Sequence, residues 1–403
     1  MKTLIVCAAV LVVAAGVAVV SSIRGVAAAG ESNVAGVRRL DGSAITGAQI
    51  DATVTSLLAA GKVTGLGLAI LEDGKIAYLK AYGIRDKEKN LALTTDSVMS
   101  AASFTKVAFA YLVMKLVEDG TLNLDRPMFE YLPKPLPEYE NYKDLAGDPR
   151  YKKITARMLL SHTSGLPNWR RFSDDEKKLR IYFEPGARFS YSGEGIDLLQ
   201  LEVETITKKG LKELMAARVF APLGMGRTSM TWEPQFEDDH ANGYDEHGNS
   251  LGPQRRPSAD AAGSMKTTVA DFAKFMQAVM NGTGLRRETR ELMLSPQARI
   301  SSVHEFPPLK TETTHANDGI RLSYGLAWGL YWSPYGKAFF KEGSDDGWRN
   351  YTVCFDEKRM GIVIMTSSSN GEGIYEELLE KLQRNTFTPV EWEQFVPYNA
   401  AGK

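Results

Sequence analysis

Apolar and polar positions after residue 47 follow two different patterns in turn. Over residues 48–60, apolar side chains recur at helical spacing, which predicts an amphipathic helix. Residues 66–71 are continuously apolar, Asp73-Gly74 can turn the chain, and residues 75–82 return with β-favouring side chains. The pattern therefore predicts a helix followed by a β-hairpin.

Extended patterns return near the C-terminus, and the middle of the chain is predicted to be helical and rich in loops. Four consecutive strands are predicted at residues 322–332, 338–342, 349–355 and 360–366, with a helix over 373–382. Strands at both ends with helices between them favour one sheet built from both chain ends. We therefore expect a mixed α+β fold, in which an antiparallel sheet is flanked by helices and carries an inserted helical subdomain.

The first 29 residues have the pattern of an export segment. Lys2 precedes an uncharged, largely apolar run over residues 3–23, and residues 27–29 are small enough for a cleavage site. The same run is long enough to span a bilayer if it is not cut, so a membrane anchor and a buried helix remain alternatives. We expect an exported protein that is periplasmic, anchored in the membrane facing the periplasm, or secreted.

The rest of the chain is expected to form one domain with short flanking segments. Residues 30–47 are small, polar and aperiodic, which is typical of a linker. Residues 48–385 hold all the predicted elements and form the expected domain. Residues 386–403 follow as a C-terminal tail, and residues 1–29 precede the domain as a signal peptide or anchor.

Composition and charge narrow the range of partners. The 403-residue chain carries 48 Lys and Arg against 49 Asp and Glu, a net charge of -1. This balance gives no electrostatic argument for a nucleic-acid partner or an anionic membrane surface. Of the two cysteines, Cys7 lies in the export segment and Cys354 in an apolar predicted strand. Cys354 is therefore expected to be a small buried residue and not a catalytic thiol.

One S-x-x-K pattern occurs in the chain, at Ser103-Phe104-Thr105-Lys106, before a long apolar run. Residues i and i+3 of a helix share a face, so the hydroxyl and the amine can approach each other. A serine hydroxyl is a weak nucleophile and needs a base, and a lysine serves only if its pKa falls from about 10.4. The same spacing also suits a capping serine beside a surface lysine, so the pattern depends on its partners.

Two further segments offer such partners. Tyr191 precedes a predicted helix over residues 196–205, and it is either a core aromatic or a proton shuttle whose pKa nearby cations lower from about 10. Lys341 ends a predicted strand and would supply a second cation. After it, Gly343 would let a substrate lie against the backbone, and the Ser344 amide is available as an oxyanion donor.

These three segments, in this order and spacing, resemble the S-x-x-K, Y-x-N and K-T-G motifs of the serine β-lactamase and penicillin-binding superfamily. The resemblance is greatest to the class C β-lactamase branch, with its esterase (family VIII-type) and D-peptidase relatives. It extends over about residues 50–385 and includes further segments typical of that branch, at residues 159–167, 221–225, 262–265 and 347–348.

The resemblance implies a role for each motif residue. Ser103 attacks the substrate carbonyl, and Lys106 takes part in removing its proton. Tyr191 passes protons to the leaving group and activates the deacylating water, while Lys341 steadies Tyr191 electrostatically. The backbone amides of Ser103 and Ser344 form the oxyanion hole. No metal and no organic cofactor are implied.

Two motif positions depart from the family pattern, and both bear on the substrate. Gly193 replaces the Y-x-N asparagine that binds the acyl-side amide, a loss of about 1 kcal/mol that Glu194 could partly make up. Glu342 replaces the K-T-G threonine, next to Gly343, where the family receives a substrate carboxylate. A carboxylate there repels another, and Asp345 with Asp346 adds negative charge.

Two other features resemble parts of a catalytic site but are not expected to be catalytic. Residues 248–252 match G-x-S-x-G, but that motif needs a strand before it and a helix after it, and the flanking residues here predict a turn. His162 lies inside the segment at 159–167 that resembles the family's loop, so a structural role is expected for it.

Three functions remain as hypotheses. The first is an esterase or amidase acting through an acyl-enzyme on Ser103, with neutral or cationic small acyl substrates. The second is a class C-like β-lactamase or D,D-peptidase that tolerates the two changes, and the third is a penicillin-binding sensor that does not turn over. The expected partner is a small ester, amide or β-lactam, with possible membrane association through the N-terminal segment and no nucleic acid.

Overall fold

The computed structural model describes residues 36–400, and the export segment expected at residues 1–29 lies outside the described residues. Its largest sheet has nine strands in the order β10-β11-β12-β13-β14-β15-β3-β4-β5, and every neighbouring pair is antiparallel. In that order the strands are Ala298–Arg299, Ser323–Tyr324, Gly329–Ser333, Gly336–Asp345, Trp348–Phe355, Met360–Thr366, Gly65–Glu72, Lys75–Asp86 and Leu91–Ala92.

The two ends of the domain meet in the middle of this sheet, as the sequence predicts. The pairing of β15 with β3 sets Ile362 opposite Ile70 and Ile364 opposite Leu68. Apart from Glu72 and Thr366 at their ends, both strands lack polar side chains, because helices cover both faces of the sheet. The α+β fold with one sheet from both chain ends is confirmed.

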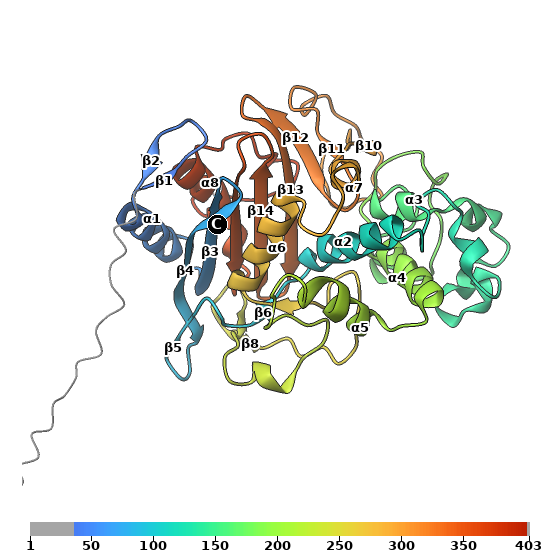
Figure 1. Cartoon of the computed structure of the whole chain (residues 1–403), viewed down its shortest axis with the longest axis horizontal. Coiled ribbons are helices and arrows are strands. Elements are labelled where there is room, and N and C mark those ends of the chain that lie inside the picture. Colours follow the sequence, from blue (N-terminus) through green and yellow to red (C-terminus); the bar gives the residue numbers. More distant parts are fainter. Residues whose placement is uncertain (1–35, 401–403) are drawn as a thin grey trace, which may run out of the picture. The chain divides into compact units, whose positions relative to one another are not determined.

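Helices cover the two faces in pairs (Figure 1). On one face, α1 (Gly47–Ala60) and α8 (Tyr375–Gln383) pack in one apolar cluster with Leu68 and Ile70 of β3. On the other face, α2 (Phe104–Glu118) and α6 (Val269–Asn281) share a second cluster with Ala69 of β3. Neighbouring residues of β3 belong to different clusters because successive side chains of a strand point to opposite faces of the sheet.

Most of the remaining helices lie in the segment between β5 and β10. They are α3 (Ala156–Leu160), α4 (Gly193–Thr207), α5 (Leu211–Met215) and α7 (Arg287–Met293), with short 3-10 and π turns between them. Two small strand pairs brace this segment: β6 (Met99–Ser100) with β9 (Lys266–Thr267), and β7 (Gly243–Tyr244) with β8 (Ser250–Gly252). The G-x-S-x-G match lies in the β7–β8 hairpin and not before a helix.

The structure departs from the expected elements in one strand. The strand expected over residues 322–332 is split into β11 and β12 by a tight turn. In this turn the Gly325 amide donates to the Trp328 carbonyl at 2.7 Å, and Ala327 has a left-handed φ of +71°. Hydrophobic pattern alone does not reveal this turn, because the residues within it are themselves apolar and buried.

The segments flanking the expected domain are also ordered. Part of the expected linker forms a two-stranded hairpin of β1 (Val37–Arg38) and β2 (Ala44–Ile45), which buries Val37 and Ile45. In the expected tail, Trp392 is buried in the cluster beneath α1 and α8. Within residues 36–400, no helix is both long and apolar enough to cross a membrane.

Candidate active site

Ser103 stands at the start of α2, on a turn that its surroundings hold in an uncommon conformation. Ser103 immediately precedes the helix, and Ala102 before it has a left-handed φ of +46°. That conformation costs a residue with a side chain roughly 1 kcal/mol. Thr105 Oγ1 donates to the Ala102 carbonyl at 2.6 Å, and Asn350 Nδ2 of β14 donates to the Ala101 carbonyl at 3.2 Å. These bonds fix the position of Ser103.

Lys106, one helical turn further on, is in direct contact with Ser103 and is almost fully buried. Its Nζ atom donates to Ser103 Oγ at 3.0 Å and to the backbone carbonyl of Ala262 at 2.5 Å. Burial, and then the positive charge of Lys341, lowers the pKa of Lys106 from 10.5 to about 8. An appreciable fraction of Lys106 is therefore neutral near pH 8, and a neutral amine can accept the hydroxyl proton.

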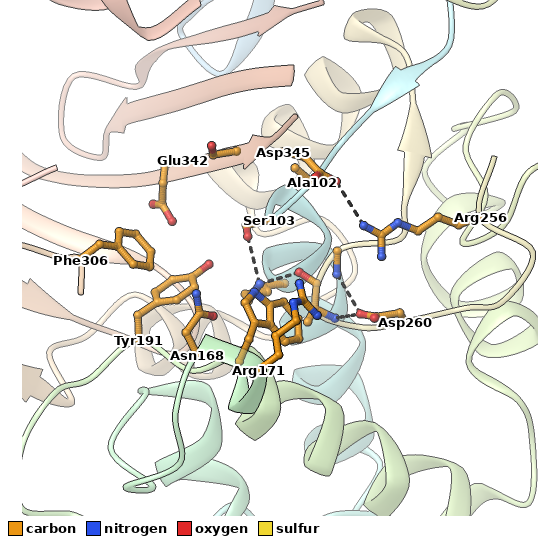
Figure 2. Close-up of a pocket in the computed structure, with 15 residues that line it drawn as sticks. Ala102, Ser103, Asn168, Arg171, Tyr191, Arg256, Asp260, Phe306, Glu342 and Asp345 are labelled. Carbon is orange, nitrogen blue, oxygen red and sulfur yellow. Dashed lines mark hydrogen bonds and ion pairs between the residues drawn. The ribbon is translucent and has the colours of Figure 1, made fainter. Parts of the chain in front are cut away.

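Tyr191 lies between two buried lysines. Its ring centroid is 5.1 Å from Lys106 Nζ and 4.5 Å from Lys341 Nζ. The Tyr191 hydroxyl points into the cavity beside Ser103, which is close enough to lower its pKa slightly through a hydrogen bond (Figure 2). Burial raises the pKa of Tyr191 above 10 and outweighs the opposing effect of Lys341. Tyr191 is thus a neutral phenol here, with a proton to donate.

His162 packs against Tyr191 and forms no hydrogen bond with Ser103. The ring centroids of His162 and Tyr191 are 4.3 Å apart, and His162 Nδ1 accepts a hydrogen bond from the Ser192 amide at 3.2 Å. Burial, together with the charges of the two lysines, holds the pKa of His162 well below 6.5. This neutral imidazole supports the loop that carries Tyr191.

Lys341 on β13 is fully buried and forms an ion pair with the carboxylate of Glu342. Burial by itself would lower the pKa of Lys341, but the charge of Glu342 and the proximity of Tyr191 hold it well above 10.5. Two other buried acids, Glu305 and Glu393, are near this pair, and burial and then Glu342 raise the pKa of each. Lys341 is therefore a permanent cation, and Glu342 is the carboxylate that neutralises it.

These groups surround one cavity of about 330 Å³. The residues indicated by the sequence that line it are Ser103, Lys106, Tyr191, Glu342, Ser344 and Asp345. The predicted site residues Gly193, Lys341 and Gly343 are not among its lining residues. Within the described part of the chain, no group of three or more His, Cys, Asp or Glu side chains is placed to hold a metal ion. The arrangement provides a nucleophile, a base of lowered pKa and a neutral phenol around one space.

The beta-lactamase family model matches residues 50–384 of this chain. The chain belongs to the beta-lactamase family. Protein flp of Staphylococcus aureus (strain MRSA252) is 26% identical over 216 residues, which cover 50% of this chain but only 42% of that protein. Penicillin-binding protein 4* of Bacillus subtilis (strain 168) is 24% identical over 344 residues, or 77% of this chain and 69% of that protein.

Two solved structures share the fold of this family member. The octameric penicillin-binding protein homologue from Pyrococcus abyssi superposes with a TM-score of 0.67 at 23% identity, covering 84% of this chain and 80% of its own. D-alanine carboxypeptidase AmpC from Burkholderia cenocepacia gives a TM-score of 0.66 at 20% identity, covering 83% and 97%. The predicted membership of the serine β-lactamase and penicillin-binding superfamily is confirmed.

Gly343, at the glycine position of the family's K-T-G segment, lies against the turn that carries Ser103. A Cβ atom on Gly343 would lie 2.8 Å from the Ala101 carbonyl oxygen and 3.3 Å from the Phe104 nitrogen. The glycine therefore allows β13 to approach the turn that carries Ser103, and its expected role beside the substrate stays a prediction. The next residue, Ser344, is exposed and lines the cavity.

Glu194 does not stand in for the missing Y-x-N asparagine. Its carboxylate accepts from the Arg170 amide at 2.9 Å and forms an ion pair with the Arg170 guanidinium at 2.6 Å. The residue that reaches the cavity instead is Asn168, whose Oδ1 accepts a hydrogen bond from the Gly193 amide at 3.1 Å. Asn168 directly follows the loop signature at 159–167, which was its only sequence signal.

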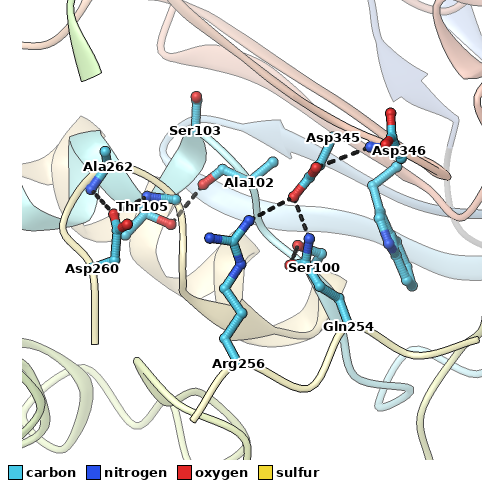
Figure 3. A network of polar contacts seen from close by, with 12 residues as sticks. Ser100, Ala102, Ser103, Thr105, Gln254, Arg256, Asp260, Ala262, Asp345 and Asp346 are labelled. Atoms are coloured by element: carbon cyan, nitrogen blue, oxygen red, sulfur yellow. Dashed lines mark hydrogen bonds and ion pairs between the residues drawn. The ribbon is translucent and has the colours of Figure 1, made fainter. Parts of the chain in front are cut away.

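A polar network beside the start of α2 changes the expected charge of the cavity (Figure 3). Asp345 accepts hydrogen bonds from Arg256 Nη2 at 3.2 Å and from Gln254 Nε2. Gln254 also accepts from Lys266, whose Nζ donates to Ser100 Oγ at 3.2 Å. Burial, and then Arg256, lowers the pKa of Lys266 to about 7. Because Arg256 pairs with Asp345, this aspartate adds less negative potential than we expected.

The sequence did not indicate several residues that line the cavity. They are Ala102, Asn168, Trp169, Arg171, Arg256, Asp260 and Phe306. Ala262 and Gly263, which belong to the segment at 262–265 that resembles the family, also line the cavity. Most of them lie on loops far apart in the chain, which only the fold brings together. Asp260 accepts hydrogen bonds from the Ala262 and Gly263 amides at 2.7 and 3.0 Å, and so shapes the turn whose carbonyl receives Lys106.

Proposed function

We propose that this protein is a serine hydrolase that forms an acyl-enzyme on Ser103 and hydrolyses a carboxylic ester or amide. The observation that carries the proposal is the 3.0 Å contact between Ser103 Oγ and the Nζ atom of a buried Lys106 whose pKa is about 8. A weak hydroxyl nucleophile beside a base tuned close to the working pH is what acyl transfer requires.

In the first half-reaction, Ser103 Oγ bonds to the substrate carbonyl carbon while neutral Lys106 takes the hydroxyl proton. The Ser103 and Ser344 amides would donate to the oxyanion. When the intermediate collapses, the bond from carbon to the leaving group breaks, and the leaving group takes a proton from the Tyr191 hydroxyl, which Lys106 replaces. The alcohol or amine departs, and the acyl group stays on Ser103.

In the second half-reaction, water attacks the acyl carbon and gives one proton to the lysine–tyrosine pair. The ester bond to Ser103 breaks, and that proton returns to its Oγ. The products are the carboxylic acid and the regenerated hydroxyl. The permanent charge of Lys341 beside Tyr191 stabilises the phenolate whenever Tyr191 gives up its proton.

The lining of the cavity favours an ester or amide substrate that has no carboxylate next to the reacting bond. Glu342 lines the cavity at the position where the family receives a substrate carboxylate, and its charge would repel such a group. Lys341 is already engaged with Glu342 and so offers little compensation. We therefore favour neutral or cationic substrates.

A β-lactamase or D,D-peptidase is the second candidate, and one observation favours it. Arg171 lines the cavity and forms no ion pair among residues 36–400; its guanidinium stacks on Trp169 and Phe172. A free guanidinium can bind a substrate carboxylate at a second position. A penicillin-binding sensor that is acylated without turnover is the third candidate.

A panel of substrates distinguishes these candidates. It compares p-nitrophenyl acetate and butyrate, nitrocefin and D-alaninamide on the wild type and on Ser103→Ala. The proposal predicts Ser103-dependent turnover of the nitrophenyl esters that exceeds that of nitrocefin. Rapid nitrocefin cleavage without ester turnover would support the second candidate, and a stable adduct without turnover would support the third.

We also propose that the protein acts outside the cytoplasm, on the pattern of residues 1–29. Fractionation of cells that produce the full chain, with N-terminal sequencing of the product, tests this. Export predicts protein in the periplasm, membrane or medium, and retention of all of it in the cytoplasm would contradict it.

A further inference from the structure

The side-chain amide of Asn168 has a defined orientation in the cavity. A backbone N–H needs an acceptor, and the Gly193 amide donates to Asn168 at 3.1 Å, so the atom facing Gly193 is Oδ1. The NH₂ group must then face the other way. It forms no hydrogen bond with the described residues, and Asn168 lines the cavity that holds Ser103. An unused donor pair is thus available to a ligand there.

The loop that carries Asn168 is held firmly in place. The Glu194 amide donates to the Asn168 carbonyl at 3.0 Å, and the Glu194 carboxylate holds both the amide and the guanidinium of Arg170. With the bond from the Gly193 amide, these contacts clamp residues 168–170 to the start of α4. A donor held in this way loses little conformational entropy when it binds a ligand.

The same loop excludes any side chain at position 193. A Cβ atom on Gly193 would lie 2.6 Å from the Trp169 ring and 2.9 Å from the Asn168 carbonyl oxygen. Contacts this short with a packed ring and with backbone require the loop to move. Gly193 and Asn168 therefore belong together: the glycine makes the room that the loop fills.

We propose that Asn168 is a substrate-binding residue whose NH₂ group donates to a carbonyl oxygen in the acyl part of the substrate. Acyl groups that carry such an oxygen, as N-acylamino acids do, would then be preferred over plain alkyl acyl groups. The inference rests on the proposed hydrolysis through Ser103 and names the substrate class for it.

Two esters of equal chain length test this: phenyl N-acetylglycinate and phenyl pentanoate. Asn168→Asp keeps the acceptor for the Gly193 amide and removes the donor, and Asn168→Ala removes both. We expect each variant to lower kcat/KM for the glycinate about tenfold, the effect of one hydrogen bond. The pentanoate should fall less than the glycinate in both variants, and circular dichroism checks that the variants remain folded.

The possible results distinguish a failure of the role proposed for Asn168 from a failure of the proposed hydrolase function. An equal fall with both esters, or no fall with either, overturns the role of Asn168 and leaves Ser103 chemistry intact. Absence of Ser103-dependent turnover in the wild type overturns the proposed function, and this inference with it.

A second, apolar cavity adjoins the first and supports an independent inference. Its volume is about 660 Å³, and it shares Asn168, Trp169 and Phe306 with the cavity of Ser103. Its other apolar lining residues are Pro167, Phe172, Pro307, Pro308 and Leu309. Phe172 is 77% exposed, more than any other large exposed hydrophobic residue of the described chain.

We infer that this cavity binds an apolar alkyl or aryl portion of the substrate whose carbonyl lies at Ser103. Two features of the structure favour that occupant. The two cavities share three lining residues and so lie next to each other, and an exposed phenyl ring gains from being covered by apolar groups. The inference also rests on the proposed function, because the occupant is part of its substrate.

A series of p-nitrophenyl esters from acetate to octanoate, kept below micelle-forming concentrations, tests the second cavity. We expect kcat/KM for the octanoate to exceed that for the acetate at least tenfold. Phe172→Ala should reduce this ratio at least threefold. Leu251→Ala is the matched control, since Leu251 is a 52% exposed residue outside both cavities.

Either of two results from this series of esters would overturn the inference. Either the octanoate is no better than the acetate in the wild type, or Phe172→Ala and Leu251→Ala change the ratio equally. If no ester in the series is hydrolysed in a Ser103-dependent manner, the proposed function fails first and this inference fails with it.

Discussion

Lys106 Nζ lies 3.0 Å from Ser103 Oγ and 2.5 Å from the Ala262 carbonyl, so two contacts aim one amine at one hydroxyl. The amine is buried, and a second buried lysine, Lys341, lies against the same Tyr191 ring. Burial and like charge both favour the neutral amine. This geometry supports the proposal that Ser103 is the nucleophile and Lys106 its base, and on that proposal the pKa of Lys106 sets the pH range in which the reaction runs.

Activity should rise with pH around the pKa of Lys106. Because this pKa is lowered from 10.5 to about 8, the neutral base forms as pH increases through 8. From pH 7 to pH 9 its neutral fraction grows from about one eleventh to about ten elevenths, so kcat/KM for an ester should increase about tenfold. Lys106→Met should abolish turnover at every pH. A flat profile from pH 6.5 to 9.5, or a midpoint near 10.5, would contradict the role of Lys106.

Replacing Glu342 should widen the range of substrates. Glu342→Thr removes a carboxylate from the cavity and frees Lys341 from its ion pair. We expect kcat/KM for nitrocefin, which carries a carboxylate, to rise tenfold or more, while that for p-nitrophenyl acetate changes little. Glu342→Gln, which removes the charge but keeps the size, should give a similar gain. If neither variant gains, carboxylate repulsion does not set the specificity.

Gly343→Ala should damage both the fold and the site. The added Cβ atom would lie 2.8 Å from the Ala101 carbonyl oxygen, so β13 must move away from the turn that carries Ser103. We expect a loss of about 1–3 kcal/mol in the free energy of unfolding and a large loss of turnover. Gly226→Ala is the control, because a Cβ atom there meets nothing within 4 Å. Equal effects of the two substitutions, measured by urea unfolding, would contradict this account.

Glu202 should make the protein less stable as pH rises. It is buried on α4, neither carboxylate oxygen has a partner among the described residues, and burial raises its pKa from 4.5 to about 8. A group with a raised folded pKa contributes stability below its unfolded pKa of 4.5 and loses that contribution as pH rises toward 8. Glu202→Gln removes this titration.

Urea unfolding at pH 5 and pH 7 measures the effect of Glu202. Glu202→Gln should gain stability over the wild type between the two pH values, by at most about 1.4 kcal/mol per pH unit. A difference between the two proteins that does not depend on pH would show that Glu202 is ionised in the folded state.

The sequence predicts those parts of the structure that depend on local pattern. The β3–β4 hairpin, α1 and the strands β13 to β15 follow from runs and periodicities of apolar residues, and Ser103 and Lys106 from a spacing of three. The burial that lowers the pKa of Lys106 comes from distant elements, so the spacing alone could not establish it.

The site features that the sequence did not predict depend on contacts between loops that are far apart in the chain. Asn168 reaches the cavity only because Gly193 leaves room for its loop, and Arg256 reaches Asp345 across 89 positions of the chain. Glu194 was expected near the substrate, but Arg170 holds it. No local pattern distinguishes these alternatives, because each is settled by the three-dimensional neighbours of the residue.

The central claim is that Ser103 carries the acyl group during turnover, and mass spectrometry tests it directly. The protein is mixed with p-nitrophenyl butyrate, quenched in acid within milliseconds to seconds, digested and mapped. We predict one butyryl group on the peptide that contains Ser103, absent from a folded Ser103→Ala variant and still present in Ser100→Ala. An adduct on another residue, or ester turnover retained in Ser103→Ala, would contradict the account.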